Sequence, residues 1–319
     1  MPRPLIAFAA LLYATIADAE PVAIAPGINL IPGSSSEGRQ PDGNSILIDA
    51  PKGLILIDTG RHTAHQKDII AFAKARQRPI AAIINTHWHL DHSGGNAEIL
   101  AAFPKIPLYA SNAIDGALRG FLPKSRAEGE AYAISGEASP EMASDIALDA
   151  TAVDDPVSLR PTFPITKSKT MKIAGRKIDV HFAPFAATEG DLWMLDGRTG
   201  VLVAGDLVVA AAPYLDTACS DGWRMALDTI AQANFRILVP GHGSPMTKAQ
   251  FLDWRNAFNN LIECAGRDLP KTNCIAGWKS DAAAFIPPGD REIDGLIDYY
   301  LDSRLRAPRD ERTRYCRPQ

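Results

Sequence analysis

The side chains most suited to chemistry are concentrated in one short segment, residues 86–96. It holds His87, His89, Asp91 and His92, which are three imidazoles and one carboxylate within six residues. Imidazole nitrogens and carboxylate oxygens are natural ligands for zinc and similar ions. The glycine pair at 94–95 lets the backbone turn tightly enough for these side chains to diverge. The spacing therefore predicts a metal site.

A metal ion at such a site would make water reactive. A bound ion lowers the pKa of its water toward about 7, and the hydroxide can then attack a carbonyl, phosphorus or sulfur centre. The chain has no Gly-x-Ser-x-Gly segment, so covalent catalysis by a serine is not indicated.

Short apolar segments alternating with amphipathic ones should position these residues. Residues 80–84 read as a buried strand leading straight into the histidine segment, and residues 45–48 and 54–58 read as neighbouring strands. Thr247 and Gln250 form a possible capping box before a helix. Further strands are expected at residues 178–182, 192–195, 201–204 and 236–239, and further helices near 96–103 and 223–232.

Three more motifs accompany the histidine segment: Leu-Ile-Asp-Thr-Gly at 56–60, Ala-Gly-Asp at 204–206 and Pro-Gly-His-Gly at 240–243. In this order they resemble the metallo-β-lactamase superfamily, over roughly residues 40 to 245. The resemblance implies an α/β fold of the four-layer αββα sandwich type, with metal ions at one edge of the sheets.

The resemblance also implies a role for each motif residue. His87 and His89 would bind a first metal ion, and Asp206 would bridge it to a second. Catalytic roles would fall to Asp91, a ligand of the second ion, and to Asp58, which would orient the metal-binding loop. The full set of implied metal ligands is His87, His89, Asp91, His92, Asp206 and His242.

One motif departs from the family pattern. Members usually carry Gly-His-Thr-x-Gly-Asp between the other motifs, whereas this chain has Ala187 where the histidine ligand belongs. Catalytic zinc normally keeps three protein ligands, so the first site should be weakened. Glu189 or His62 could substitute, the second site could act alone, or the protein could be catalytically weak.

A narrower likeness concerns residues 188–193, residues 216–219 and the cysteine-bearing tail. These segments resemble the quinoprotein relay system zinc metallohydrolases, exported proteins associated with quinone-cofactor dehydrogenases. An aspartate at position 206, where zinc β-lactamases usually carry cysteine or serine, resembles the glyoxalase II-like branches that cleave thioesters and other esters. The resemblance to the quinoprotein relay system metallohydrolases implies a periplasmic quinoprotein as a partner.

The start of the chain is typical of an export signal. Arg3 precedes an apolar stretch at residues 5–16, and Ala17-Asp18-Ala19 fits a cleavage site. The apolar stretch is too short to span a bilayer. We therefore predict a signal peptide at 1–19, a catalytic domain at 20–250 and a helical extension at 251–319, in the periplasm or secreted.

Export would make the four cysteines informative, because an oxidising compartment permits disulfides. Three pairings are possible. Cys264 and Cys274 close a short loop, which favours that pair and leaves Cys219 with Cys316.

Composition excludes other classes of function. The net charge is −4 and no basic run stands out, which argues against a nucleic-acid surface. Residues from about 120 to 170 contain several prolines and little periodicity, so an inserted, partly irregular segment is expected there.

These observations predict a metal-dependent hydrolase of esters, thioesters, lactones or lactams. Zinc suits the histidine-rich ligands, and iron or manganese fits the carboxylates. The alternative is a non-catalytic accessory or binding protein with a degenerate metal site, which Ala187 motivates.

Overall fold

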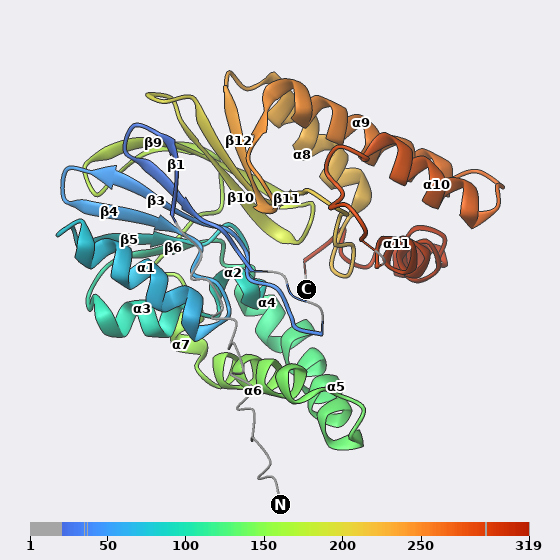
Figure 1. Ribbon diagram of the computed structural model, residues 1–319, viewed down its shortest axis with the longest axis horizontal. Helices are drawn as coiled ribbons and strands as arrows, with labels where there is room; N and C mark the ends of the chain where they lie inside the picture. Colours follow the sequence, from blue (N-terminus) through green and yellow to red (C-terminus); the bar gives the residue numbers. More distant parts are fainter. Residues whose placement is uncertain (1–20, 35, 37, 291, 319) are drawn as a thin grey trace, which may run out of the picture.

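The computed structural model describes residues 21–34, 36, 38–290 and 292–318. The segment interpreted as a signal peptide lies outside these residues. Two β-sheets pack face to face, and helices cover their outer faces (Figure 1). This is the four-layer αββα arrangement that the motifs predicted. Within the described part of the chain, no helix is both long and apolar enough to cross a membrane.

The first sheet holds seven strands in chain order, with β5 parallel to both of its neighbours. Helices α1 (Thr63–Ala75) and α3 (Asn96–Ala102) pack against its outer face. The strands are β1 (Val22–Ala25), β2 (Ile28–Ile31), β3 (Ser45–Ala50), β4 (Gly53–Ile57), β5 (Ile80–Ile84), β6 (Leu108–Ala110) and β7 (Phe163–Pro164).

The second sheet has six strands in the order β13-β12-β11-β10-β9-β8, and its only parallel pair among the described residues is β11 with β12. Helices α8 (Ser220–Gln232) and α9 (Lys248–Ala265) cover it, and Thr247 and Gln250 form the predicted capping box of α9. The strands are β8 (Lys169–Ile173), β9 (Arg176–Phe185), β10 (Glu189–Asp196), β11 (Val201–Val209), β12 (Ile237–His242) and β13 (Met246–Thr247).

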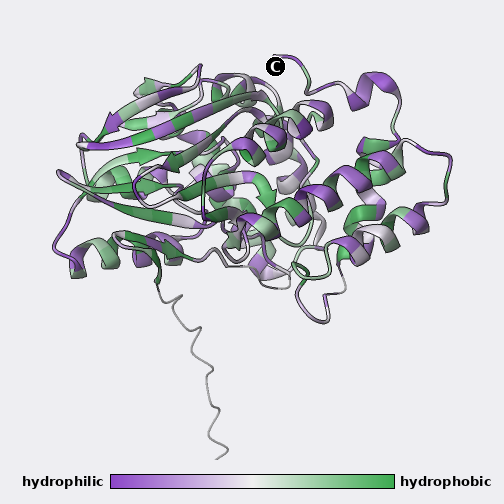
Figure 2. Ribbon diagram, turned by 90° about the horizontal axis from the view of Figure 1, so that it is seen from above, coloured by the Kyte–Doolittle hydropathy of each residue, from purple (hydrophilic) through white to green (hydrophobic). Residues whose placement is uncertain are grey.

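Alternating side chains explain why the sheets are covered on both faces. Ile55 and Ile57 of β4 pack between the two sheets, whereas Leu54 and Leu56 of the same strand pack toward α1 and α3. Successive side chains of a strand point to opposite faces, so a continuous apolar strand must be buried on both. In Figure 2 the strands carry green, hydrophobic stretches that are interrupted by purple, hydrophilic ones.

The C-terminal helices pack in the same hydrophobic core as the helices that cover the second sheet. Trp278 of α10 (Lys271–Asp281) and Ile297 of α11 (Ile293–Tyr300) belong to the same buried cluster as Trp223 and Trp254. A π-helical turn (Leu301–Leu305) and the short α12 (Arg309–Arg312) follow.

The expectation of a partly irregular segment is wrong for most of residues 120–170. Residues 120–170 mostly form the helices α5 (Phe121–Ser135), α6 (Pro140–Asp154) and α7 (Pro156–Leu159), which follow α4 (Ile114–Arg119). Pro140 and Pro156 occupy first helical positions, where a proline costs no hydrogen bond, and Ser139 and Asp155 cap the two helices. Two of the prolines that suggested loops therefore mark helix starts.

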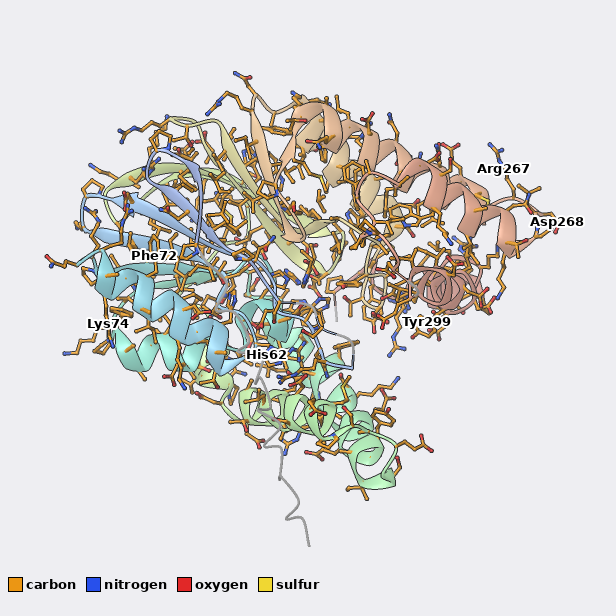
Figure 3. The ribbon with its side chains drawn as sticks, viewed as in Figure 1. His62, Phe72, Lys74, Arg267, Asp268 and Tyr299 are labelled. Atoms are coloured by element: carbon orange, nitrogen blue, oxygen red, sulfur yellow. A yellow bond between two sulfur atoms is a disulfide. The ribbon has the colours of Figure 1, made fainter. Side chains whose placement is uncertain are left out.

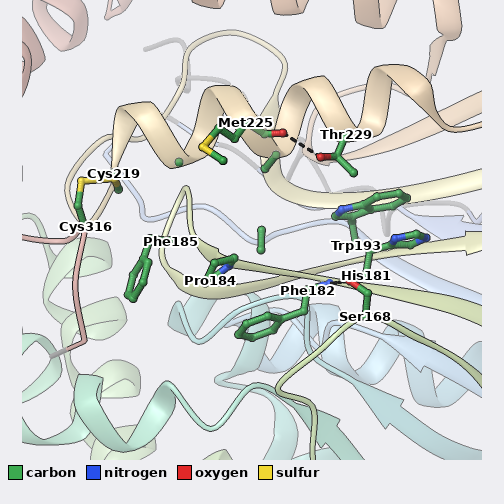
Figure 4. Close-up of a pocket in the computed structure, with 13 residues that line it drawn as sticks. Ser168, His181, Phe182, Pro184, Phe185, Trp193, Cys219, Met225, Thr229 and Cys316 are labelled. Atoms are coloured by element: carbon green, nitrogen blue, oxygen red, sulfur yellow. Dashed lines mark hydrogen bonds between the residues drawn. A yellow bond between two sulfur atoms is a disulfide. The ribbon is translucent and has the colours of Figure 1, made fainter.

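Both favoured disulfides are present, Cys264–Cys274 and Cys219–Cys316. The second joins the start of α8 to the end of the described chain. It lies beside a cavity of about 380 Å³ between α8 and the β9–β10 hairpin, where the rings of His181 and Trp193 stack (Figure 4).

Candidate metal centre

The residues singled out in the sequence meet where the two sheets end. His87, His89, Asp91 and His92 follow β5, in the turn that leads through α2 (Leu90–Ser93) to α3. The second sheet contributes Asp206 from β11 and His242 from the last position of β12. The strand ends of both sheets thus deliver their polar side chains to one place.

Two groups of these side chains are compact enough to hold an ion. The first group consists of His87, His89 and Asp206, and the second group consists of Asp91, His92, Asp206 and His242. In each group the ligand atoms lie within 4.8 Å of one another. All six predicted ligands are thereby brought together, and Asp206 belongs to both groups.

Distances within the second group are short. His242 Nε2 lies 3.0 Å from Asp91 Oδ2 and 3.5 Å from Asp206 Oδ1. The Nε2 atoms of His92 and His242 are 3.2 Å apart. Two imidazole nitrogens and two carboxylates that converge in this way form a donor set suited to a divalent cation.

Buried polar atoms without partners indicate that an ion fits here. Among the described residues, His87 Nε2 and Asp206 Oδ2 are buried without a hydrogen bond, and they lie 3.7 Å apart. Leaving such atoms unsatisfied is costly, so they normally have a partner. A cation between them would provide one.

The surrounding histidines favour the ionised form of the carboxylates, which is the form that binds metal ions. Burial by itself raises the pKa of Asp206, but His92, His242 and His87 outweigh it and hold that pKa well below its usual value. The pKa of Asp91 is also held well below its usual value, because the effects of His92 and His242 outweigh the rise caused by burial.

Asp58 supports the ligand loop through three hydrogen bonds. Its carboxylate accepts from the backbone N–H of Thr86 at 2.7 Å, from the Thr86 hydroxyl at 2.7 Å and from His92 Nδ1 at 2.8 Å. The bond to Nδ1 leaves His92 Nε2 to face the centre. Such carboxylate–histidine contacts fix the ring orientation of metal ligands.

Two glycines allow the strands to approach the centre closely. Gly205 has a φ of +55°, and a Cβ there would lie 2.6 Å from Thr86. At Gly241 a Cβ would lie 1.9 Å from Asp206 Oδ1. Larger residues would displace the shared carboxylate, which explains why Gly-Asp and Gly-His occur as motifs.

Asn44 is a supporting residue that the sequence did not reveal. Its amide nitrogen donates to the carbonyl oxygens of Pro240 and Gly243, each at 2.9 Å, and its backbone N–H donates to Gly241 at 2.7 Å. A residue that precedes β3 therefore holds the loop that carries His242. Asn44 belongs to no recognisable motif, so only the folded chain shows this contact.

A second unforeseen residue, Thr217, contacts the first group. His89 Nε2 lies 2.9 Å from the buried Thr217 hydroxyl, which donates to the carbonyl oxygen of Ala187 at 3.2 Å. A hydroxyl has one proton, so Thr217 must accept from His89 Nε2–H if it donates to Ala187. His89 Nδ1 is then left with the lone pair that a metal ion needs.

Neither suggested substitute for the missing histidine lies in these groups. Both ring nitrogens of His62 face carboxylates, Nδ1 toward Asp42 at 2.8 Å and Nε2 toward Asp145 at 3.0 Å, and the residue lies near α6 (Figure 3). Glu189 is likewise absent from the two ligand groups found among the described residues. The structure therefore places neither residue in the two ligand groups.

Comparison with known proteins agrees with this geometry. The family model of the metallo-beta-lactamase superfamily matches residues 38–242, which span every ligand candidate and most of the chain. The chain belongs to the metallo-β-lactamase superfamily. Within that superfamily, it carries alanine at position 187, where the sequence motif leads one to expect a histidine.

Curated relatives within the superfamily include hydrolases. A linear primary-alkylsulfatase from Pseudomonas sp. is 27% identical over 223 residues, which cover 63% of this chain and 41% of the relative. A hydroxyacylglutathione hydrolase from Xylella fastidiosa is 36% identical over 70 residues, or 22% of each chain. The chain thus spans about two fifths of the alkylsulfatase's length.

Solved structures show the shared fold. A metallo-beta-lactamase from Pontibacter korlensis aligns with a TM-score of 0.56 and 18% identity, covering 76% of this chain and 99% of that one. The sec-alkyl sulfatase PisA1 aligns with a TM-score of 0.63 and 16% identity, covering 93% of this chain and 50% of that one.

Proposed function

We propose that this superfamily member is a metal-dependent hydrolase that uses an activated water to cleave an ester, thioester, lactone or lactam. The observation that carries the proposal is the convergence of two ligand groups on Asp206, each with its donor atoms within 4.8 Å. Curated relatives named as a sulfatase, a hydroxyacylglutathione hydrolase and an acyl carrier protein thioesterase support hydrolysis as the reaction class.

Each residue has a proposed task. His87 and His89 would hold one cation and Asp91, His92 and His242 would hold another, with Asp206 available to both. Asp58 orients His92 and the Thr86 turn. When bound, the cations lower the pKa of water toward about 7 and polarise the substrate oxygen. We propose zinc as the native metal, and the carboxylates also suit iron or manganese.

The same reasoning extends to the cellular setting. Two disulfides fit an oxidising compartment. Together with the export signal expected at residues 1–19, they support a periplasmic location. We propose a periplasmic quinoprotein as a partner on the resemblance of residues 188–193 and 216–219 alone.

A second candidate function is favoured by Ala187. The first group has two histidines and one carboxylate, and Thr217 lies beside Ala187 as a hydrogen-bonding residue. A site weakened in this way would suit an accessory or binding protein that binds metal poorly and turns over no substrate.

Elemental analysis of the purified protein, combined with a panel of thioester, ester, lactone and β-lactam probes, separates the two functions. At least one equivalent of zinc, iron or manganese with turnover that a chelator abolishes supports the hydrolase. Metal clearly below one equivalent, with no turnover of any probe after the protein is supplemented with each metal, supports the accessory protein.

A further inference from the structure

A cavity of about 460 Å³ begins at the second ligand group. His242 and Tyr214 line it, together with the end of β11 and the turn between β12 and β13. The segment between α10 and α11 and the start of α11 supply the rest of its wall. The volume lies in the range of pockets that bind small organic ligands.

The wall supplied by the C-terminal segment is mostly apolar, and it also carries two carboxylates, those of Asp290 and Glu292. Ile293 is buried, and the other apolar side chains of this wall are partly or largely exposed. Apolar side chains left accessible around a concave surface gain free energy when an apolar ligand covers them. The side chains concerned are Phe285, Ile286, Pro287, Pro288, Ile293 and Leu296.

Tyr214 marks the polar end of the cavity. Its ring contacts that of His242 edge-on, with centroids 5.4 Å apart. The cavity therefore runs from polar groups at the ligand centre to apolar side chains of the C-terminal segment.

We propose that this cavity binds the aliphatic acyl chain of a neutral ester, thioester or lactone, whose carbonyl lies at the ligand centre. The inference rests on the proposed hydrolytic function and names its substrate class. In the reaction the oxygen of water bonds to the acyl carbon and the C–O or C–S bond breaks. A proton of that water passes to the leaving oxygen or sulfur.

The size of the effect follows from burial of methylene groups. Transfer of one methylene from water to an apolar site corresponds to a two- to fourfold gain in kcat/KM. We expect this gain per carbon along a series of p-nitrophenyl esters from acetyl to decanoyl, until the chain fills the cavity. An ester whose chain ends in a carboxylate should react at least tenfold more slowly than its methyl-ended counterpart, because a charge is costly to bury.

Ile286→Asn tests the wall directly. Ile286 lies in a turn rather than in a helix or strand, and the variant should flatten the slope of log kcat/KM against chain length. Ile134→Asn is the matched control, because Ile134 lies on α5, is 85% exposed and does not line the cavity. That control should keep the slope. Circular dichroism of both variants checks folding, and the series on the unaltered protein requires no substitution.

Calorimetric titration with straight-chain 2-alkanones separates this inference from the proposed function. Ketones cannot be hydrolysed, so ketone affinity that rises with chain length supports the cavity even when no ester turns over. Ester turnover without any dependence on chain length would overturn the inference and leave the hydrolase standing. An unchanged slope in folded Ile286→Asn would overturn it as well.

Discussion

His89 and Thr217, 128 positions apart in the sequence, are joined by a hydrogen bond of 2.9 Å between Nε2 and the buried hydroxyl. Because the hydroxyl also donates to the Ala187 carbonyl, it sets the tautomer of His89 and frees Nδ1 for a cation. The chain thus orients the second histidine of its first ligand group through a residue outside the family motifs.

Removing this hydroxyl should weaken metal binding at the first group. We expect Thr217→Val to lower affinity for the more weakly held ion about 10- to 100-fold, as measured by competition with a chelator. Thr217→Ser should keep most of the affinity because it retains the hydroxyl. Thr229→Val, which removes an exposed hydroxyl of α8, is the control. Equal losses in the valine and serine variants would contradict the tautomer argument.

Loss of a ligand from the second group should abolish turnover. Asp91→Ala and His242→Ala each remove a donor from the four-residue group and should reduce hydrolysis to background, while circular dichroism stays close to that of the unaltered protein. Asp228→Ala, at an exposed position of α8, should retain full activity. Turnover that survives both ligand substitutions would overturn the site assignment.

Asp58→Asn should act through geometry rather than through loss of a ligand. The amide keeps the size of the side chain but cannot accept all three hydrogen bonds from Thr86 and His92. We expect metal affinity and kcat to fall about 10- to 100-fold together, with the second group still binding metal in elemental analysis. An unchanged chelator-competition curve would show that Asp58 only shapes the turn.

The contacts of His62 predict a pH dependence of stability. The hydrogen bond to Asp42 raises the pKa of His62 against the opposing effect of burial, and Asp145 raises it further. Since the folded pKa is raised, the stabilisation is complete below the ordinary pKa near 6.5 and is lost as pH rises through the higher folded value. Urea unfolding should therefore show stability that declines above neutral pH.

The His62→Gln variant isolates this contribution. Breaking a buried, hydrogen-bonded charge pair costs about 3 kcal/mol, so the variant should be less stable at pH 6 and should lack the decline above neutral pH. The pKa of Asp42 falls to about 2, because the His62 contacts outweigh burial. The stabilisation that depends on the ionised Asp42 carboxylate is consequently lost only as pH falls toward 2. If the stability of the variant still falls above neutral pH, another titratable group must cause the fall.

The two disulfides should differ in what they contribute. The Cys219–Cys316 bridge spans 97 positions and the Cys264–Cys274 bridge spans 10. From the loss of chain entropy in the unfolded state, the long bridge should stabilise the folded protein by about 4–5 kcal/mol and the short bridge by about 2–3 kcal/mol. Replacing each pair by alanine and measuring urea unfolding should show the larger loss for the long-range bridge. The reverse order would mean that native-state packing, rather than the unfolded chain, dominates.

The sequence revealed those parts of the protein that short motifs encode. The segment from His87 to His92 has residue types and a spacing that are unusual outside metal sites. The layered fold and the roles of Asp206 and His242 were predicted from the resemblance of the motifs to the superfamily, and the apolar segments indicated where the strands lie. Asn44 and Thr217 escaped notice because a single polar residue carries no local pattern, and their roles arise only when distant strands meet. The helical insertion was misjudged because Pro140 and Pro156 were interpreted as breaking helices rather than starting them.

The shared position of Asp206 has a mechanical consequence. His87, His89, Asp91 and His92 follow a strand of the first sheet, whereas Asp206 and His242 belong to the second sheet. Each ligand group therefore needs residues from both sheets. A cation bound in either group would cross-link the two sheets. Any movement that parts the sheets at this edge would open both coordination spheres at once.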